Sequence, residues 1–236
     1  LYSITILFLY SCSIEKKTES IDFNSNSTKS LINLLALEDS LKNQNTILID
    51  IRKPEEFLKG HLPKAQNIWR PDIRNNDTIV EGLLASKQKI EDLLSKLGAT
   101  NKSLIIVYDA KGNPDAARLW WILKYYSHNK VALLNGGITA FDSTKLTTEI
   151  FTPTPTQFEF QNNINTSYYA DKIDVLAAID DTNSIILDNR SKEEFNGLEK
   201  KGNAGKAGRI PNSIFIDYSD NIDYQNKQKF KSIKDL

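Results

Sequence analysis

The stretch LIIVYDAKGNPDAAR, residues Leu104 to Arg118, is the part of the chain that most clearly indicates the fold. An apolar run typical of a buried strand ends just before Asp109, and Asn113 and Pro114 suit the cap and first position of a helix. Main-chain NH groups and the positive end of the helix dipole would then converge on Asp109. The stretch therefore predicts an anion-binding loop whose centre already holds a carboxylate.

Strand and helix patterns alternate around this stretch. Apolar residues at 90, 93, 94 and 97 follow the spacing of an amphipathic helix, which Gly98 would end. The runs 47–51 and 131–134 have the apolar character of short buried strands. Because such alternation is typical of a parallel sheet with helices on both faces, the sequence predicts an α/β fold.

An internal repeat divides the chain. ILIDIRKPEEF (47–57) recurs as IILDNRSKEEF (185–195) at an offset of 138 residues, and GHLPKA (60–65) recurs as GRIPNS (208–213) after ten additional residues. A period this long indicates duplicated domains rather than a solenoid. In the first copy, Asp50 and Arg52 lie where strand gives way to helix, and we expect an ion pair that fixes this corner.

The composition argues against several classes of function. Thirty basic and thirty acidic residues cancel, and no basic stripe suggests a nucleic-acid partner. The single cysteine, Cys12, excludes an intrachain disulfide, and the two histidines, His61 and His128, argue against a histidine-rich metal site. We expect no metal and no other cofactor. His61 is interpreted as a turn or hydrogen-bonding residue, because the second copy has Arg209 at that place, and His128 as a solvated helix end.

The first thirty residues have the pattern of an exported protein. Residues 1–10, LYSITILFLY, resemble the apolar core of a signal peptide, and LYSC, ending at Cys12, resembles the lipobox of bacterial lipoproteins. Residues 13–30 are polar and suit a flexible tether. Without a methionine at position 1, we expect a chain that starts inside its reading frame. The alternatives are a lipid-anchored protein on the periplasmic side of the cell envelope and, if the segment is no signal, a cytoplasmic one.

Several motifs in the same order resemble a known family. The D-x-R, E-E-F and G-H-L-P pattern, VYDAKGNPDAARLWWIL (107–123) and VALLNGGITAF (131–141) resemble the first half of a tandem rhodanese, a thiosulfate or 3-mercaptopyruvate sulfurtransferase. The resemblance implies two rhodanese-like domains, each a parallel sheet flanked by helices, with the second incomplete. We place a non-catalytic first domain at 31–146, an extended linker at 147–167 and a truncated second domain at 168–236.

The resemblance also implies a mechanism. In this family a cysteine in the second domain's loop accepts a sulfane sulfur as a persulfide and passes it to a thiol or cyanide, while the first domain usually has aspartate there. Asp109 would then be the built-in anion of a degenerate site. The repeat places the nucleophile near position 257, beyond Leu236, with the tail 227–236 as the preceding helix. No residue of this chain would be catalytic, Cys12 included, and we expect the chain as given to be inactive.

The family also suggests one binding residue and leaves alternatives open. Arg190 matches an arginine that helps to hold the anionic donor, although an ion pair with Asp188 would also explain it. Of Trp120 and Trp121, adjacent on a helix, at most one would fit comfortably in its own core. We expect ordinary burial, with packing of the other against the second domain as the alternative. The main alternative to a sulfurtransferase is a non-catalytic rhodanese-like binding or sulfur-handling lipoprotein. A rhodanese-like phosphatase fits the tandem format poorly, and the preferred donor, the acceptor and the oligomeric state are not determined.

Overall fold

The computed structural model describes residues 29–75, 82–202, 204–232 and 234–235. Cys12, the apolar leader and the tether up to residue 28 lie outside these residues. The first part of the chain contains the strands β1 (Leu31–Ile32), β2 (Thr46–Asp50), β3 (Ala65–Asn67), β4 (Leu104–Tyr108) and β5 (Val131–Leu134), and the helices α1 (Leu34–Ser40), α2 (Pro54–Lys59), α3 (Lys87–Lys96) and α4 (Pro114–Tyr125). The second part contains α5 (Lys172–Ala178), β6 (Leu187–Asp188), α6 (Lys192–Phe195), β7 (Ile214–Phe215), β8 (Ile222–Asp223) and β9 (Lys229–Phe230). Short 3-10 helices are η1 (Arg70–Ile73), η2 (Gly137–Ala140), η3 (Ser143–Lys145), η4 (Thr166–Tyr168) and η5 (Tyr218–Asn221).

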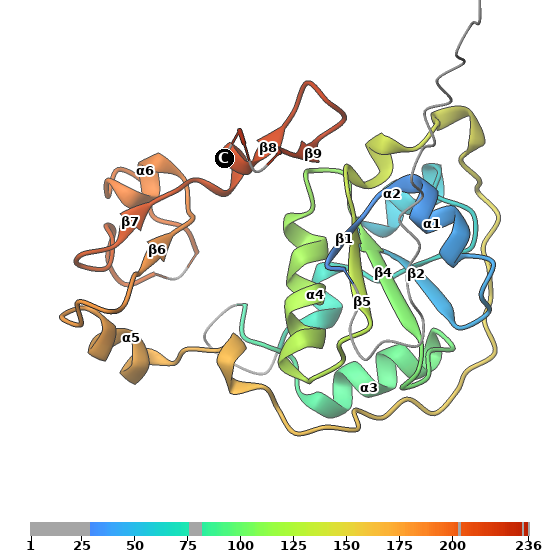
Figure 1. Cartoon of the computed structure of the whole chain (residues 1–236), viewed down its shortest axis with the longest axis horizontal. Helices are drawn as coiled ribbons and strands as arrows, with labels where there is room; N and C mark the ends of the chain where they lie inside the picture. Colours follow the sequence, from blue (N-terminus) through green and yellow to red (C-terminus); the bar gives the residue numbers. More distant parts are fainter. Residues whose placement is uncertain (1–28, 76–81, 203, 233, 236) are drawn as a thin grey trace, which may run out of the picture.

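The first part is built on one parallel sheet. Its five strands have the order β1-β5-β4-β2-β3, and every adjacent pair is parallel. Helices α3 and α4 cover one face, and α1 and α2 cover the other (Figure 1). Each face has its own buried cluster, so alternate residues of the central strand β4 pack in opposite directions, Ile105 toward α3 and α4 and Ile106 toward α1 and α2. The α/β fold predicted from the alternating pattern is confirmed.

The boundaries around β4 follow local chemistry in most places. Helix α3 ends before Gly98, which has the left-handed φ of 74° expected at a helix end. Pro114 opens α4 as predicted. Asn113 occupies the N-cap position predicted for it, but with φ 72° its side chain makes no cap hydrogen bond. Its amide instead donates to the main-chain oxygen of Leu134 at 2.8 Å and ties the loop to β5.

The segment expected as a linker is extended but belongs to the first domain's core. Phe158 and Phe160 are buried among α3 and α4 residues. The main-chain NH of Phe158 donates to Ser95 Oγ at 2.9 Å, and that of Phe160 donates to Glu91 Oε1 at 2.9 Å. The segment therefore straps α3 onto the sheet, and the alternate prolines that predicted an extended chain do not make it a free tether.

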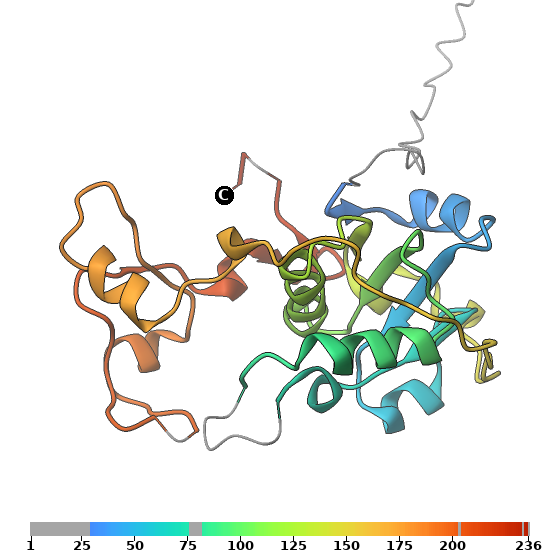
Figure 2. The ribbon, with the colours of Figure 1, turned by 90° about the horizontal axis from the view of Figure 1, so that it is seen from below.

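The second part repeats the first, element by element. Residues 172–178 of α5 correspond to 34–40 of α1 at the offset of 138, β6 corresponds to the end of β2, and β7 corresponds to β3. β6 and β7 pair in parallel, like β2 and β3. This part lies to one side of the first domain, next to α4 (Figures 1 and 2). The duplicated architecture that the repeat predicts is therefore present from α5 to β7.

The tail does not form the predicted helix. Lys227 and Gln228 have φ values of 54° and 53° and form a turn, and Phe230 pairs with Ile222 in the antiparallel pair β8–β9. The NH of Phe230 also donates to Asn135 Oδ1 of the first domain at 2.9 Å. Contacts with the first domain thus override the helical character of this lysine-rich segment.

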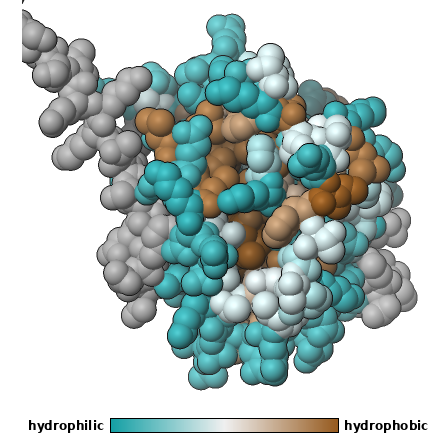
Figure 3. All heavy atoms as spheres, turned by 90° about the vertical axis from the view of Figure 1, so that its right-hand side faces the viewer, coloured by the Kyte–Doolittle hydropathy of each residue, from teal (hydrophilic) through white to brown (hydrophobic). Residues whose placement is uncertain are grey.

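Two surface features of the described residues complete the fold. Apolar side chains gather in a hollow on the face seen in Figure 3, which is the right-hand side of Figure 1, where α1, α2 and the extended segment lie. Leu35, Leu58, Ile150 and Phe151, which are 47% to 63% exposed, are among the large apolar residues of these elements. In the described part of the chain, every helix is too short or too polar to cross a lipid bilayer.

Candidate functional site

The loop after β4 encloses the carboxylate of Asp109. Four main-chain NH groups donate to it: Lys111 and Asn113 to Oδ1, both at 2.8 Å, and Asp115 and Ala116 to Oδ2, at 3.0 and 3.3 Å. The side chain is 3% exposed. The last two donors belong to the first turn of α4, whose dipole also favours an anion. The convergence of amides predicted from the sequence is thus present, and the anion is part of the protein.

Burial and hydrogen bonding act in opposite directions on Asp109. Removal from water raises the pKa of its carboxyl group, and the main-chain NH donors oppose this rise. Gly137, which has φ 53°, packs closely against the Asp109 loop. A Cβ at this position would lie 2.2 Å from the main-chain oxygen of Asp109. The Asn-Gly-Gly turn after β5 therefore completes the wall behind the loop.

A hairpin from the second part covers the mouth of this loop. Ile222 is 4% exposed, and its side chain lies 3.0 Å from where a Cβ of Gly112 would be. Thr139 Oγ1 donates to the main-chain oxygen of Lys227 at 2.7 Å. The Asp109 loop is therefore filled from inside by a carboxylate and closed from outside by an apolar side chain.

The Asp-x-Arg motif forms the same structure in both copies. Arg52 Nη2 donates to Asp50 Oδ2 at 2.6 Å and to the main-chain oxygen of Gly60 at 2.8 Å. Arg190 Nη2 donates to Asp188 Oδ2 at 2.6 Å and to the main-chain oxygen of Gly208 at 2.9 Å. The expected ion pair at the first corner is confirmed, and Arg190 is oriented in the same way.

The two arginines differ in exposure. The side chain of Arg52 is 10% exposed, whereas that of Arg190 is 43% exposed. The hydrogen bond from Arg190 holds the pKa of Asp188 below its usual range. Arg190 Nη1 also lies 3.8 Å from Glu194 Oε1. The ion pair with Asp188 explains the orientation of Arg190. Binding of an anionic ligand by the exposed edge of the guanidinium remains a proposal.

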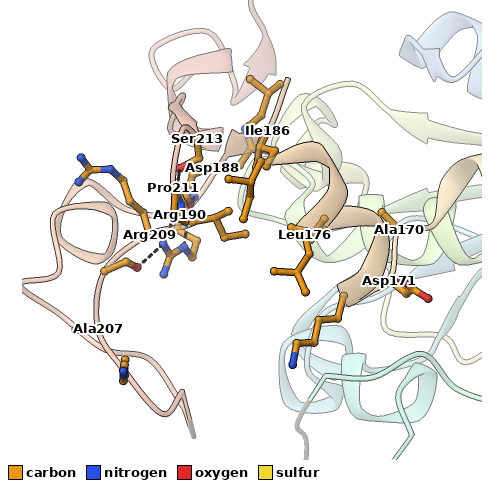
Figure 4. A pocket seen from close by; sticks show the side chains of 18 residues that line it. Ala170, Asp171, Leu176, Ile186, Asp188, Arg190, Ala207, Arg209, Pro211 and Ser213 are labelled. Carbon is orange, nitrogen blue, oxygen red and sulfur yellow. Dashed lines mark hydrogen bonds and ion pairs between the residues drawn. The ribbon is translucent and has the colours of Figure 1, made fainter. Parts of the chain in front are cut away.

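Arg190 lines a cavity of about 890 Å³ in the second part (Figure 4). The repeat relates its apolar lining to a buried cluster of the first domain, with Val175, Ile186 and Ile210 in the places of Leu37, Leu48 and Leu62. In the first domain these leucines pack against β4 and β5 side chains such as Ile106 and Leu134. The cavity is therefore the place that the next two strands occupy in the first copy, rather than a preformed ligand pocket.

This combination of sheet order, loop and repeat has a match among known families. The family model of the rhodanese-like domain matches residues 34–144. Residues 34–144 form a rhodanese-like domain. The thiosulfate sulfurtransferase of Azotobacter vinelandii is 25% identical over 189 residues, which are 79% of this chain and 68% of that protein. The sulfur carrier protein TtuD of Thermus thermophilus is 28% identical over 189 residues, 75% of this chain and 64% of that protein. The chain thus spans about two thirds of the length of these relatives.

A solved structure shows the same fold over most of the chain. SseA from Escherichia coli, whose structure was described for the rhodanese fold and mechanism of 3-mercaptopyruvate sulfotransferases, superposes with a TM-score of 0.74 at 21% identity. The match covers 88% of this chain and 81% of that one, so it extends beyond the rhodanese-like domain into the second part.

His61 has a structural position in the rhodanese-like domain. It is fully buried and stacks on Phe57, with ring centroids 3.7 Å apart. Its Nδ1 lies 3.0 Å from the oxygen of Phe57, and its Nε2 lies 3.1 Å from the oxygen of Glu149. The imidazole ties α2 to the start of the extended segment, as expected for a hydrogen-bonding residue.

The interpretation of His128 as a solvated helix end is wrong. The ring is buried against Phe158, and its Nε2 lies 3.0 Å from the main-chain oxygen of Ser103. Burial lowers the pKa of His128 to about 4. No local pattern around His128 indicates its burial, because Phe158 lies thirty residues further along the chain, in the segment that straps α3.

Acid should therefore destabilise the protein through His128. The unfolded chain binds a proton on this residue below pH 6.5, whereas the folded chain binds one only near pH 4. The contribution of His128 to the free energy of unfolding is fully present above pH 6.5. It decreases by about 3 kcal/mol as the pH falls from 6.5 to about 4. Urea unfolding at several pH values should give a flatter pH dependence for His128→Gln than for the wild type, and parallel curves would contradict this assignment.

Both tryptophans of α4 contact the segment that leads into the second part. Trp121 Nε1 donates to the main-chain oxygen of Tyr168 at 2.6 Å, and Trp120 meets the Tyr168 ring edge-on at 6.1 Å. Arg118 lies over the Trp121 ring, 4.6 Å from its centroid. Both indoles are partly buried against the core of the rhodanese-like domain, in agreement with the expected burial, and both also contact the segment that leads into the second part.

The sequence reasoning missed the hairpin β8–β9 and its contact with Gly112. A weak signal was available, since Ile68 and Asp72 recur as Ile216 and Asp220 at an offset of 148 residues. At this offset η5 corresponds to η1, and β8 corresponds to the residues that follow η1.

Proposed function

We propose that the protein to which this chain belongs is a sulfurtransferase of the thiosulfate or 3-mercaptopyruvate type. The observation that supports this most directly is the duplicated architecture, in which the first anion-binding loop is occupied by Asp109. A second loop of the same kind, with a cysteine beyond Leu236 at its first position, would bind an anionic sulfur where the first loop binds the carboxylate oxygens of Asp109. The relatives named for sulfur transfer and sulfur carriage support the same class of chemistry.

The reaction has two displacement steps on one sulfur atom. The cysteine thiolate attacks the outer sulfur of thiosulfate, the S–S bond breaks, and sulfite leaves with the electron pair, which gives a cysteine persulfide. Cyanide or a thiolate then attacks the outer sulfur of the persulfide, takes it, and releases the cysteine thiolate. Four or so NH donors and a helix N-terminus would stabilise each anionic sulfur and keep the thiol ionised.

In this proposal the rhodanese-like domain has a supporting role. Its loop is filled by Asp109 and closed by Ile222, and its residues 34–144 contain no cysteine. The 236-residue chain should therefore show no turnover by itself.

The test measures thiocyanate formed from thiosulfate and cyanide, and sulfide released from 3-mercaptopyruvate with a thiol, by the full-length protein. Replacing the cysteine of the second loop by serine should abolish both activities, and the 236-residue chain serves as a matched inactive control. Absence of turnover with both donors by a folded full-length protein would contradict the proposal.

The likeness to TtuD supports a second candidate, a sulfur carrier that forms a persulfide but gives it only to a partner protein. Incubation with thiosulfate followed by mass spectrometry separates the two. A stoichiometric persulfide that small acceptors do not discharge would favour the carrier, and rapid discharge by cyanide would favour the enzyme.

We also propose that Cys12 carries a lipid that anchors the protein in the cell envelope. The support is the apolar run of residues 1–10, the cysteine that follows it and the polar stretch after Cys12. With the complete leader present, Cys12→Ala should move the protein from the membrane to the soluble fraction. Equal membrane association of both forms would exclude this anchor.

A further inference from the structure

The hairpin that closes the Asp109 loop contains an unfavourable turn. Its strands β8 and β9 lie between the rest of the second part and the first domain (Figure 1). In the connection between them, Lys229 NH donates to the main-chain oxygen of Asn226 at 3.2 Å. The two central residues of this turn, Lys227 and Gln228, have left-handed φ values of 54° and 53°. Such positions favour Gly and Asn, because a Cβ raises the energy of the left-handed conformation. The turn is therefore not expected to be stable by itself.

A buried polar atom adds to this cost. The side-chain oxygen of Gln228 is buried and has no hydrogen-bond partner among the described residues. A buried acceptor without a donor is less favourable than the same group in water. Both costs, the left-handed turn and the unpaired oxygen, disappear when the hairpin leaves its place and becomes solvated.

Contacts with the first domain offset these costs. Ile222 of the hairpin is 4% exposed, so its apolar surface is almost completely removed from water. The main-chain NH of Phe230 donates to Asn135 Oδ1 at 2.9 Å. The main-chain oxygen of Lys227 lies so close to the Asn-Gly-Gly turn that a Cβ at Gly136 would be 2.7 Å from it. The hairpin is thus held in an unfavourable conformation by its partner surface.

The hydroxyl of Thr139 suits both a docked and an undocked hairpin. Its Oγ1 lies 2.7 Å from the main-chain oxygen of Lys227 and 2.7 Å from that of Gly136. A hydroxyl has one proton to donate, so the two oxygens compete for it. When the hairpin undocks, the proton stays with Gly136, and the first domain is left with no unpaired hydroxyl. This lowers the free-energy cost of undocking.

We propose that residues 222–230 form a latch, which opens and closes on the first domain while that domain stays folded. The closed latch seals the Asp109 loop and joins the second part to the Asn-Gly-Gly turn after β5. The open latch leaves the second part held where Trp121 donates to the main chain of Tyr168, so that the two parts can change their relative orientation. A ligand that binds at their boundary in only one state would shift this equilibrium. The inference does not depend on the proposed sulfur transfer.

Hydrogen exchange of the 236-residue chain, followed by mass spectrometry, tests whether the latch opens separately. The amides of residues 222–232 should be protected relative to an unfolded peptide, yet exchange at least tenfold faster than those of β4. Exchange of both segments at one rate, set by global unfolding, would overturn the proposal. Exchange of residues 222–232 at the rate of an unfolded peptide would also overturn it, because no closed state would then exist.

Two substitutions should shift the latch in opposite directions. Thr139→Val removes the hydroxyl that bonds Lys227 in the closed state and should speed exchange of residues 222–232 about fivefold, whereas Thr139→Ser should not. Gln228→Gly removes the unpaired oxygen and the penalty of the left-handed φ, and should slow this exchange about fivefold. Exchange of β4 should stay the same in all three variants, which separates an effect on the latch from an effect on the whole domain.

The matched control is Thr144→Val, which removes a hydroxyl of η3 that bonds Asp142 within the same turn. It should leave exchange of residues 222–232 unchanged. Faster exchange in Gln228→Gly would overturn the proposal, because the turn would then not oppose closure. Equal exchange in Thr139→Val and the wild type would overturn it as well, because the Asn-Gly-Gly turn would then not hold the latch.

Discussion

Replacement of Asp109 by alanine is expected to destabilise the rhodanese-like domain by about 3–5 kcal/mol. Among the described residues, the four main-chain NH groups that donate to this carboxylate have no other acceptor, and Asp109 is buried. Each buried donor left without an acceptor costs about 1–3 kcal/mol, and water entering the vacated space recovers part of the loss. Urea unfolding of the wild type and the variant measures the difference.

The matched control is Asp109→Asn, which keeps the shape and one acceptor oxygen. It should lose about half as much stability, because its amide NH₂ faces donors where the second carboxylate oxygen was. If the loop is an anion cradle, sulfate should raise the Tm of Asp109→Ala more than that of the wild type. A variant as stable as the wild type and indifferent to sulfate would show that the loop does not require an anion.

Asp50→Ala is expected to cost about 3–5 kcal/mol, and Asp188→Ala only about 1 kcal/mol. The two aspartates make the same hydrogen bonds to the following arginine, so the difference comes from the surroundings. Arg52 is almost enclosed and would be left as an unpaired charge, whereas Arg190 can turn to water. Chemical denaturation of each variant in the same chain provides the comparison.

A double-mutant cycle sharpens this second test. Adding Arg52→Met to Asp50→Ala should restore part of the lost stability, because the stranded guanidinium is removed, while Arg190→Met in the Asp188→Ala background should change little. Equal losses at the two corners would mean that solvent exposure does not control the strength of these pairs.

Local signals were sufficient for the elements near Asp109. The apolar run 104–108, Pro114 at a helix start and Gly98 at a helix end each act within a few residues, through hydrogen bonding and allowed φ values, so they could be interpreted without knowledge of neighbours. Asn113 shows the limit of this reasoning. Its side chain had a local use as a cap, but a main-chain oxygen of β5, twenty-one residues away, offered a better buried partner.

The sequence by itself determined the duplicated α/β architecture and the carboxylate in the first loop, because strand periodicity and helix boundaries are properties of nearby residues, and the repeat is a direct match between two segments of the chain. Only the tertiary structure decided what closes that loop, why His128 is buried and what the tail 227–232 forms. Ile222 meets Gly112, and Phe158 meets His128, across long separations in the chain. Such contacts form when complete helices and strands pack together. Burial of apolar surface stabilises a contact with any partner of suitable shape, so the local sequence pattern does not specify which residues meet.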